Sequence, residues 1–132
     1  MRYLGLCFDH MHMGDLLRLV ADTPGCSIAG IYDPDMSKMS AAIEAHAIPA
    51  EQVYTDLMTA LSTSGADAAI ICSTTAEHAN VTVAAFAACL HVICEKPFAA
   101  NVADADRMIE ASATFAANGP LPGTHRTSRL SV

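Results

Sequence analysis

The sequence predicts an α/β fold built on a doubly wound parallel sheet. Short apolar runs alternate along the chain with longer segments of helical period, which is the pattern of repeated β-α-β units. One of these runs, DAAIIC (residues 67–72), is apolar on both faces and so has the character of a central parallel strand. The chain has 132 residues, 52% of them hydrophobic, which is enough for one core. We therefore expect a single domain.

The first part of the chain contains one complete β-α-β unit. YLGLCF (residues 3–8) and SIAGIY (Ser27–Tyr32) are the expected strands, with a helix over about residues 14–21 between them. A second helix is expected over residues 35–46, where apolar residues recur near a 3.6-residue period. Pro49 prevents this helix from continuing.

The middle of the chain is expected to supply an edge strand and the central strand. A brief strand over residues 52–54 precedes a short helix that carries Leu57 and Leu61. The doubly apolar run over residues 67–72 then forms the central strand.

The last part repeats the alternation. A helix is expected to start near residue 75, because Thr74 and Glu77 have the spacing of a capping box. HVIC (His91–Cys94) is the next strand, and Asn101 is the expected cap of a final helix. We assign residues 1–118 to the domain and residues 119–132 to a linker or to the truncated start of a further domain.

Composition excludes several classes of partner. The net charge is −7 and the basic residues are scattered, which argues against nucleic acid. No stretch is long and apolar enough for a membrane span, and the amino terminus lacks the apolar region of a signal peptide. Five cysteines without a C-x-x-C pair are typical of free thiols in a reducing compartment. We therefore expect a cytoplasmic protein.

The predicted topology fixes the place of a binding site. In a doubly wound sheet, ligands bind beyond the carboxyl ends of the strands, where the strand order reverses. The residues at those ends include acids, histidines, small hydroxyl side chains and one lysine. The candidate site residues are Phe8, Asp9, His10, His12, Asp33, Ser73, Thr74, Glu95, Lys96 and Pro97.

Asp33 carries a specific prediction about the ligand. It ends the second expected strand, where a carboxylate accepts hydrogen bonds from the ribose hydroxyls of a dinucleotide and repels a 2′-phosphate. This position favours NAD over NADP. The alternative is that Asp33 caps the helix expected to start near Asp35.

Three segments together resemble a known family. AGIYDPD, STTAEHANVTVAA and HVICEKPFAANVADADRM are similar to the amino-terminal NAD(P)-binding Rossmann domain of the Gfo/Idh/MocA family, which includes glucose-fructose oxidoreductase and inositol dehydrogenase. The resemblance covers nearly all of residues 1–118. It implies that Lys96 lies beside the nicotinamide and the substrate hydroxyl, that a cis peptide precedes Pro97, and that Glu95 orients Lys96. It also implies that His78 packs against the nucleotide-binding loop.

The first turn departs from the family pattern. A dinucleotide fingerprint would place glycines at positions 7, 9 and 12, but this chain has Cys7, Asp9 and His12. The carboxylate of Asp9 would repel a phosphate at the end of a helix. Either the loop has shifted so that free N–H groups near residues 10–14 still bind phosphate, or the cofactor site is weak. Asp9, His10 and His12 would also suit a metal, but we expect none and favour contacts with substrate hydroxyls.

Two functions stay open. The first is the nucleotide-binding portion of an NAD-dependent oxidoreductase that acts by hydride transfer on a sugar, polyol or related hydroxyl compound. The second is a non-catalytic binding module or truncated fragment that associates with another chain. The resemblance implies a second, substrate-binding domain that we expect to be absent here, so a small hydroxylated substrate is a partner only where that domain is present. We expect the chain alone to be inactive, and self-association into a homo-oligomer is left open.

Overall fold

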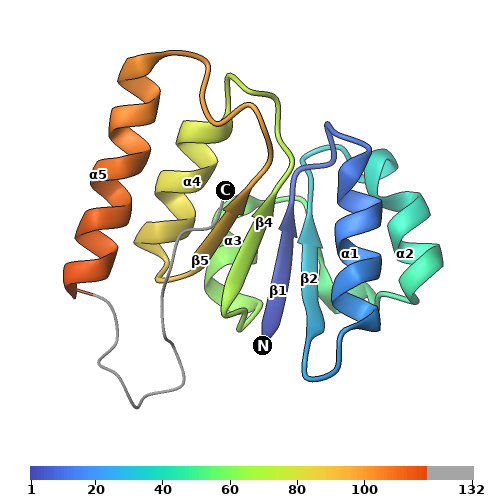
Figure 1. Ribbon diagram of the computed structural model, residues 1–132. Coiled ribbons are helices and arrows are strands. Elements are labelled where there is room, and N and C mark those ends of the chain that lie inside the picture. The colour runs from blue at the N-terminus through green and yellow to red at the C-terminus, as the bar shows by residue number, and fades with distance from the viewer. Residues whose placement is uncertain (119–132) are drawn as a thin grey trace.

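The computed structural model describes residues 1–118, which form one parallel sheet with helices on both faces (Figure 1). The strands are β1 (Arg2–Leu6), β2 (Ser27–Tyr32), β3 (Val53–Tyr54), β4 (Ala68–Ile71) and β5 (His91–Cys94). Every paired neighbour runs parallel in the order β3-β2-β1-β4-β5. The doubly wound fold is therefore confirmed, and the strand order reverses between β1 and β4. The predicted linker over residues 119–132 lies outside the described residues.

The helices divide between the two faces of the sheet. Their bounds are α1 (His12–Asp22), α2 (Ser40–His46), α3 (Leu57–Thr63), α4 (His78–Ala87) and α5 (Val102–Asn118), with short 3-10 turns η1 (Met36–Met39) and η2 (Ala50–Gln52). Side chains of α1 and α2 share one core cluster with one face of the strands. Side chains of α3, α4 and α5 share a second cluster on the other face. In Figure 1, α1 and α2 lie to the right of the labelled strands, and α4 and α5 lie to their left, with α5 outermost.

Two predicted helices begin differently from expectation. The segment predicted as one helix over residues 35–46 is the 3-10 turn η1 followed by α2, and Asp35 caps it by accepting the N–H of Ser37 at 3.0 Å. The capping box at Thr74 is wrong, because Glu77 donates its N–H to the Thr74 carbonyl at 2.9 Å in a turn. The helix α4 therefore begins only at His78.

The first strand ends earlier than predicted, and the last helix begins as predicted. Cys7 has a φ of 66°, so the chain turns out of the strand direction immediately after Leu6. Its N–H still donates to the Tyr32 carbonyl at 2.8 Å. At α5 the predicted cap is confirmed, since the side-chain oxygen of Asn101 accepts the N–H of Asp104 at 2.9 Å.

The described residues contain no helix that combines the length and the apolar character needed to cross a membrane.

The central strand β4 is buried at all four of its positions, as its doubly apolar sequence predicts. Because β4 lies between β1 and β5 and all three strands are parallel, the loops that follow β1 and β5 lie at the same carboxyl edge of the sheet.

Candidate functional site

The loops at the carboxyl edge are joined through the end of β4. Asp9 donates its N–H to the Cys72 carbonyl at 3.1 Å, which fixes the first loop, and Glu95 donates its N–H to the Ile71 carbonyl at 3.0 Å, which fixes the corner after β5. The structure thus brings together the segments that the sequence assigned to the crevice. The loop after β2 is joined to them by a side chain, Asp33.

Cys7 takes the conformation that a glycine would be expected to supply. It stands where the first fingerprint glycine is missing, and its φ of 66° lies in the left-handed region that glycine adopts most readily. The chain therefore turns sharply after β1 although no glycine is present at the turn. Phosphate binding by this loop stays a prediction.

The carboxylate of Asp33 joins two loops. Asp33 is only 1% exposed; one oxygen accepts the N–H of Phe8 at 2.8 Å and the other accepts the N–H of Asp35 at 2.8 Å. The alternative that Asp33 caps the next helix is wrong, since Asp35 is the residue in the capping position. The pKa of Asp35 lies below its ordinary value, mainly because its side chain accepts hydrogen bonds from Ser37. Contact of Asp33 with ribose stays a prediction.

The charge of Asp9 is balanced by a residue that the sequence reasoning missed. Lys38 Nζ donates to Asp9 Oδ1 at 2.7 Å, and this bond is the main reason that the pKa of Lys38 lies above its ordinary value. The pair joins the first loop to η1. The repulsion of phosphate by Asp9, expected from the sequence, is therefore reduced. The sequence did not reveal this role of Lys38, because its partner Asp9 lies 29 residues away in the chain.

Glu95 pairs with His12. Nδ1 of His12 lies 3.1 Å from Glu95 Oε1, and Glu95 Oε2 accepts the backbone N–H of Lys96 at 3.0 Å. Burial alone would raise the pKa of Glu95, but the hydrogen bonds from His12 and from the Lys96 N–H outweigh it, so the pKa lies below the ordinary value. The carboxylate of Glu95 thus binds the Lys96 backbone, and its effect on the orientation of the Lys96 amine stays a prediction.

His10 packs beside this pair. Its ring centroid lies 4.6 Å from that of His12, with the planes inclined at 51°. Within residues 1–118, Nδ1 of His10 is buried and has no hydrogen-bond partner. The same part of the chain holds no group of three side chains arranged to bind a metal ion.

The His78 side chain contacts the backbone of Pro97, the residue after Lys96. The side chain is 1% exposed, with Nδ1 2.9 Å from the Pro97 carbonyl oxygen and Nε2 3.1 Å from the Ser73 carbonyl oxygen. Carbonyl oxygens only accept, and a neutral imidazole has a single N–H, so the ring donates to one of these two oxygens in each tautomer. His78 thus joins the loop after β4 to the Lys96-Pro97 corner, and its packing on the nucleotide-binding loop stays a prediction.

Lys96 is exposed at the edge of the crevice. The peptide bond between Lys96 and Pro97 is cis, as the resemblance implied. Lys96 lines a small cavity of about 170 Å³ with Leu16 of α1 and with Ile93 of β5. Its Nζ makes no hydrogen bond or ion pair within the described residues. An unpaired amine at this position is available to a ligand.

The remaining residues of the site are polar groups and thiols around β4. The Ser73 hydroxyl is buried and donates to the Thr74 carbonyl at 3.2 Å, whereas Thr74 is exposed. Burial is the main cause that raises the pKa of the thiols, to about 12 for Cys7, about 12 for Cys72 and about 11 for Cys94. These thiols are packing groups, as the sequence predicted.

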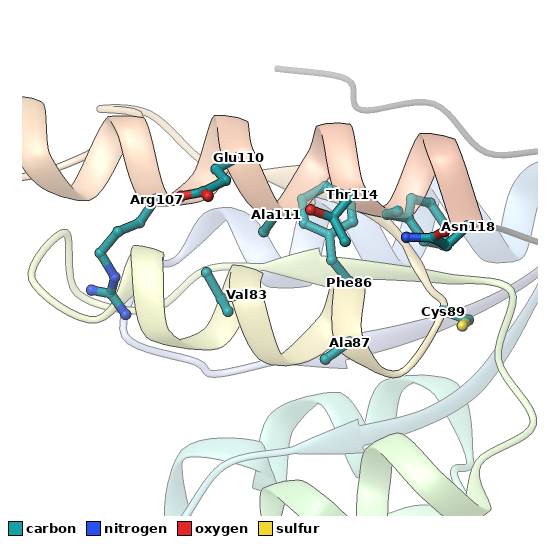
Figure 2. Close-up of a pocket in the computed structure, with 10 residues that line it drawn as sticks. Val83, Phe86, Ala87, Cys89, Arg107, Glu110, Ala111, Thr114 and Asn118 are labelled. Atoms are coloured by element: carbon teal, nitrogen blue, oxygen red, sulfur yellow. The ribbon is translucent and has the colours of Figure 1, made fainter.

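A larger groove lies away from the crevice. It has a volume of about 520 Å³ and is lined by side chains of α4 and α5, among them Phe86 and Phe115. Figure 2 shows the labelled Phe86 of α4 and Thr114 of α5 in this lining. None of its lining residues belongs to the crevice segments. No motif or spacing in the sequence predicted this groove.

Comparisons with known proteins agree with this geometry. The family model described as "Oxidoreductase family, NAD-binding Rossmann fold" matches residues 7–115. Inositol 2-dehydrogenase of Salmonella paratyphi B is 36% identical over 98 residues, which cover 74% of this chain and 29% of that protein. Myo-inositol 2-dehydrogenase of Thermotoga maritima is 42% identical over 60 residues, covering 46% of this chain and 18% of that protein.

Solved structures show the same fold. Myo-inositol 2-dehydrogenase of Lactobacillus plantarum superposes with a TM-score of 0.78 at 20% identity, over 99% of this chain and 36% of that one. An oxidoreductase of Agrobacterium radiobacter, in complex with NAD+, L-tartaric acid and magnesium, gives 0.79 at 23% identity, over 87% of this chain and 33% of that one. The chain spans less than a third of the length of the curated relatives it matches, between 18% and 30%. It belongs to the Gfo/Idh/MocA oxidoreductase family, of which it is the NAD-binding Rossmann domain.

Proposed function

We propose that the chain is the cofactor-binding portion of an NAD-dependent dehydrogenase that oxidises a hydroxyl group of a polyol or sugar. The observation that carries this proposal is the meeting of the first loop and the Lys96 corner above β4, through His12 and Glu95. Relatives named as inositol 2-dehydrogenases and D-apiose dehydrogenase support the substrate class.

The crevice offers a separate group to each part of the dinucleotide. The loop of residues 8–12 leads into α1 and would hold the pyrophosphate, since N–H groups at the start of a helix bind anions. Asp33 and Lys38 lie on the adenosine side, and Lys96 lies on the nicotinamide side. The turn at Cys7, formed without glycine, supports the fit of a dinucleotide to this loop.

Bound NAD would supply the hydride acceptor, and the residues of this chain would manage the proton and the geometry. Lys96 Nζ, which has no partner within the described residues, can take the proton of a substrate hydroxyl. Asp33 favours NAD over NADP, because its charge would oppose a 2′-phosphate.

Substitution of Lys96 tests the catalytic assignment. In an enzyme form that includes a substrate domain, Lys96→Ala is expected to lower kcat by about 10²-fold or more, the usual effect of a general base. NADH affinity should change little, because the lost interaction is with the reacting hydroxyl. Lys38→Ala is the matched control, since Lys38 lies on the adenosine side and should alter KM for NAD more than kcat. Unchanged turnover in Lys96→Ala would reject the assignment.

A non-catalytic binding module is the second candidate. The replacement of two fingerprint glycines by Asp9 and His12 supports it, because both side chains narrow the space over the loop. Binding of NAD without hydride transfer to any of a panel of polyols and sugars would favour this candidate.

The proposal also includes a cellular location and an oligomeric state. Cytoplasmic location is supported by the five cysteines, all of which are free. Self-association into a homo-oligomer is a prediction that sedimentation analysis of the purified chain can test.

A further inference from the structure

We propose that His12 is a positioning residue for Lys96, acting through Glu95. Nδ1 of His12 lies 3.1 Å from Glu95 Oε1, and Glu95 Oε2 accepts the Lys96 N–H at 3.0 Å. One carboxylate thus joins the first residue of α1 to the backbone from which the lysine side chain projects. The inference rests on the proposed function, which assigns Lys96 to the reacting hydroxyl.

Both ends of this link are fixed to the same strand. His12 and Glu95 are 83 residues apart, and the sheet order puts β4 between β1 and β5, so their contact spans the end of β4. The N–H of Asp9 holds the first loop to Cys72, and the N–H of Glu95 holds the corner to Ile71. The sheet therefore sets the distance between the two side chains. A glycine at position 12, as the fingerprint would have, has no side chain with which to make this contact.

The link keeps the Lys96 amine unpaired. Glu95 and Lys96 are neighbours in sequence. A Glu95 carboxylate that made no other hydrogen bond would be the nearest ion-pair partner for the Lys96 ammonium. In the structure each oxygen of Glu95 already accepts one hydrogen bond, from His12 or from the Lys96 N–H, and the side chain is only 18% exposed. Nζ of Lys96 is left without a partner among residues 1–118. His12 thereby holds the lysine backbone and leaves the lysine amine free for a ligand.

The effect should be confined to Glu95 and Lys96. The next residue, Pro97, is held separately, since His78 lies 2.9 Å from its carbonyl oxygen. His10 packs on the His12 ring at 4.6 Å but makes no bond to Glu95. Removal of the His12 side chain should therefore loosen the carboxylate and the Lys96 N–H without releasing the whole corner.

Amide hydrogen exchange on the 132-residue chain tests the link. His12→Ala should speed exchange of the Lys96 N–H by about tenfold, the change that follows from the loss of one net hydrogen bond to a charged group. His12→Asn should restore exchange to within about threefold of the wild type, because the amide nitrogen of Asn can stand near the position of Nδ1. His46→Ala is the control: His46 ends α2, makes no side-chain hydrogen bond in the described residues, and should leave exchange unchanged.

A measurement on the wild type covers the case in which a variant does not fold. An NMR cross-peak between the His12 ring protons and the Glu95 side chain is expected, and its absence would overturn the proposal. Unaltered Lys96 exchange in folded His12→Ala would also overturn it. NADH binding, followed by fluorescence in the same samples, tests the proposed function alone. A chain that binds NADH but shows no effect of His12→Ala refutes only the positioning role, and a chain that shows the effect but binds no NADH refutes only the function.

Discussion

Replacement of Asp33 by Asn tests whether this carboxylate supports the crevice structurally. Asp33 is 1% exposed and accepts two backbone N–H groups at 2.8 Å, from Phe8 and from Asp35. An Asn side chain has the same shape but only one acceptor oxygen, so one N–H would face an amide that also donates. The loss of one hydrogen bond to a charged group costs about 1.5–3 kcal/mol. We expect Asp33→Asn to lower the free energy of unfolding by about 2–3 kcal/mol.

Urea unfolding followed by circular dichroism measures this change, without NAD in the sample. Asp35→Asn is the matched control, because Asp35 is an exposed capping residue and Asn caps a helix about as well as Asp. Its free energy of unfolding should stay within about 0.5 kcal/mol of the wild type. Equal stability of Asp33→Asn, Asp35→Asn and the wild type would refute the structural role of Asp33 and leave ribose binding as its only function.

Three further predictions concern the loops and the thiols. Cys7→Val should destabilise the chain by about 1–2 kcal/mol more than Cys72→Val in urea unfolding, because a β-branched residue resists the positive φ found at position 7; equal losses would contradict it. Iodoacetamide labelling of the native chain at pH 8, read by mass spectrometry, should modify the partly exposed Cys26 and Cys89 before the three buried thiols, whose raised pKa values keep them protonated. The lowered pKa of Glu95 means that its contribution to stability is present above its ordinary pKa of 4.5 and is lost as the pH falls through the lower native value. Unfolding between pH 3 and 7 should therefore depend less on pH in Glu95→Gln, and an identical pH profile would count against the His12 contact.

The fold was predictable because its signal is local. SIAGIY and HVIC are apolar runs bounded by turn residues, and both form strands over the predicted residues. The capping box at Thr74 failed because the same residues can close a turn after a strand, and the backbone bond from Glu77 to Thr74 formed instead. The first strand ends early because Cys7 has a left-handed φ, and a cysteine side chain does not predict that backbone conformation.

The site was predictable in its location and much less so in its pairings. Topology correctly assigned the first loop and the corner after β5 to one edge of the sheet. The partner of Glu95 is His12 and the partner of Asp9 is Lys38, both distant in sequence, so neighbours in the chain gave no guide to either pair. The sequence analysis therefore did not predict the contact between Glu95 and His12.

Calorimetric titration of the 132-residue chain with NAD+ and with NADP+ tests the central claim most directly. We predict saturable binding of one NAD+ per chain and weaker binding of NADP+. We also predict a loss of NAD+ affinity when the fold is kept but the first loop is altered by His12→Asp, which adds a third carboxylate to those of Asp9 and Glu95. Absence of NAD+ binding to the folded wild-type chain would contradict the account, because the loop turn at Cys7 would then not serve a dinucleotide.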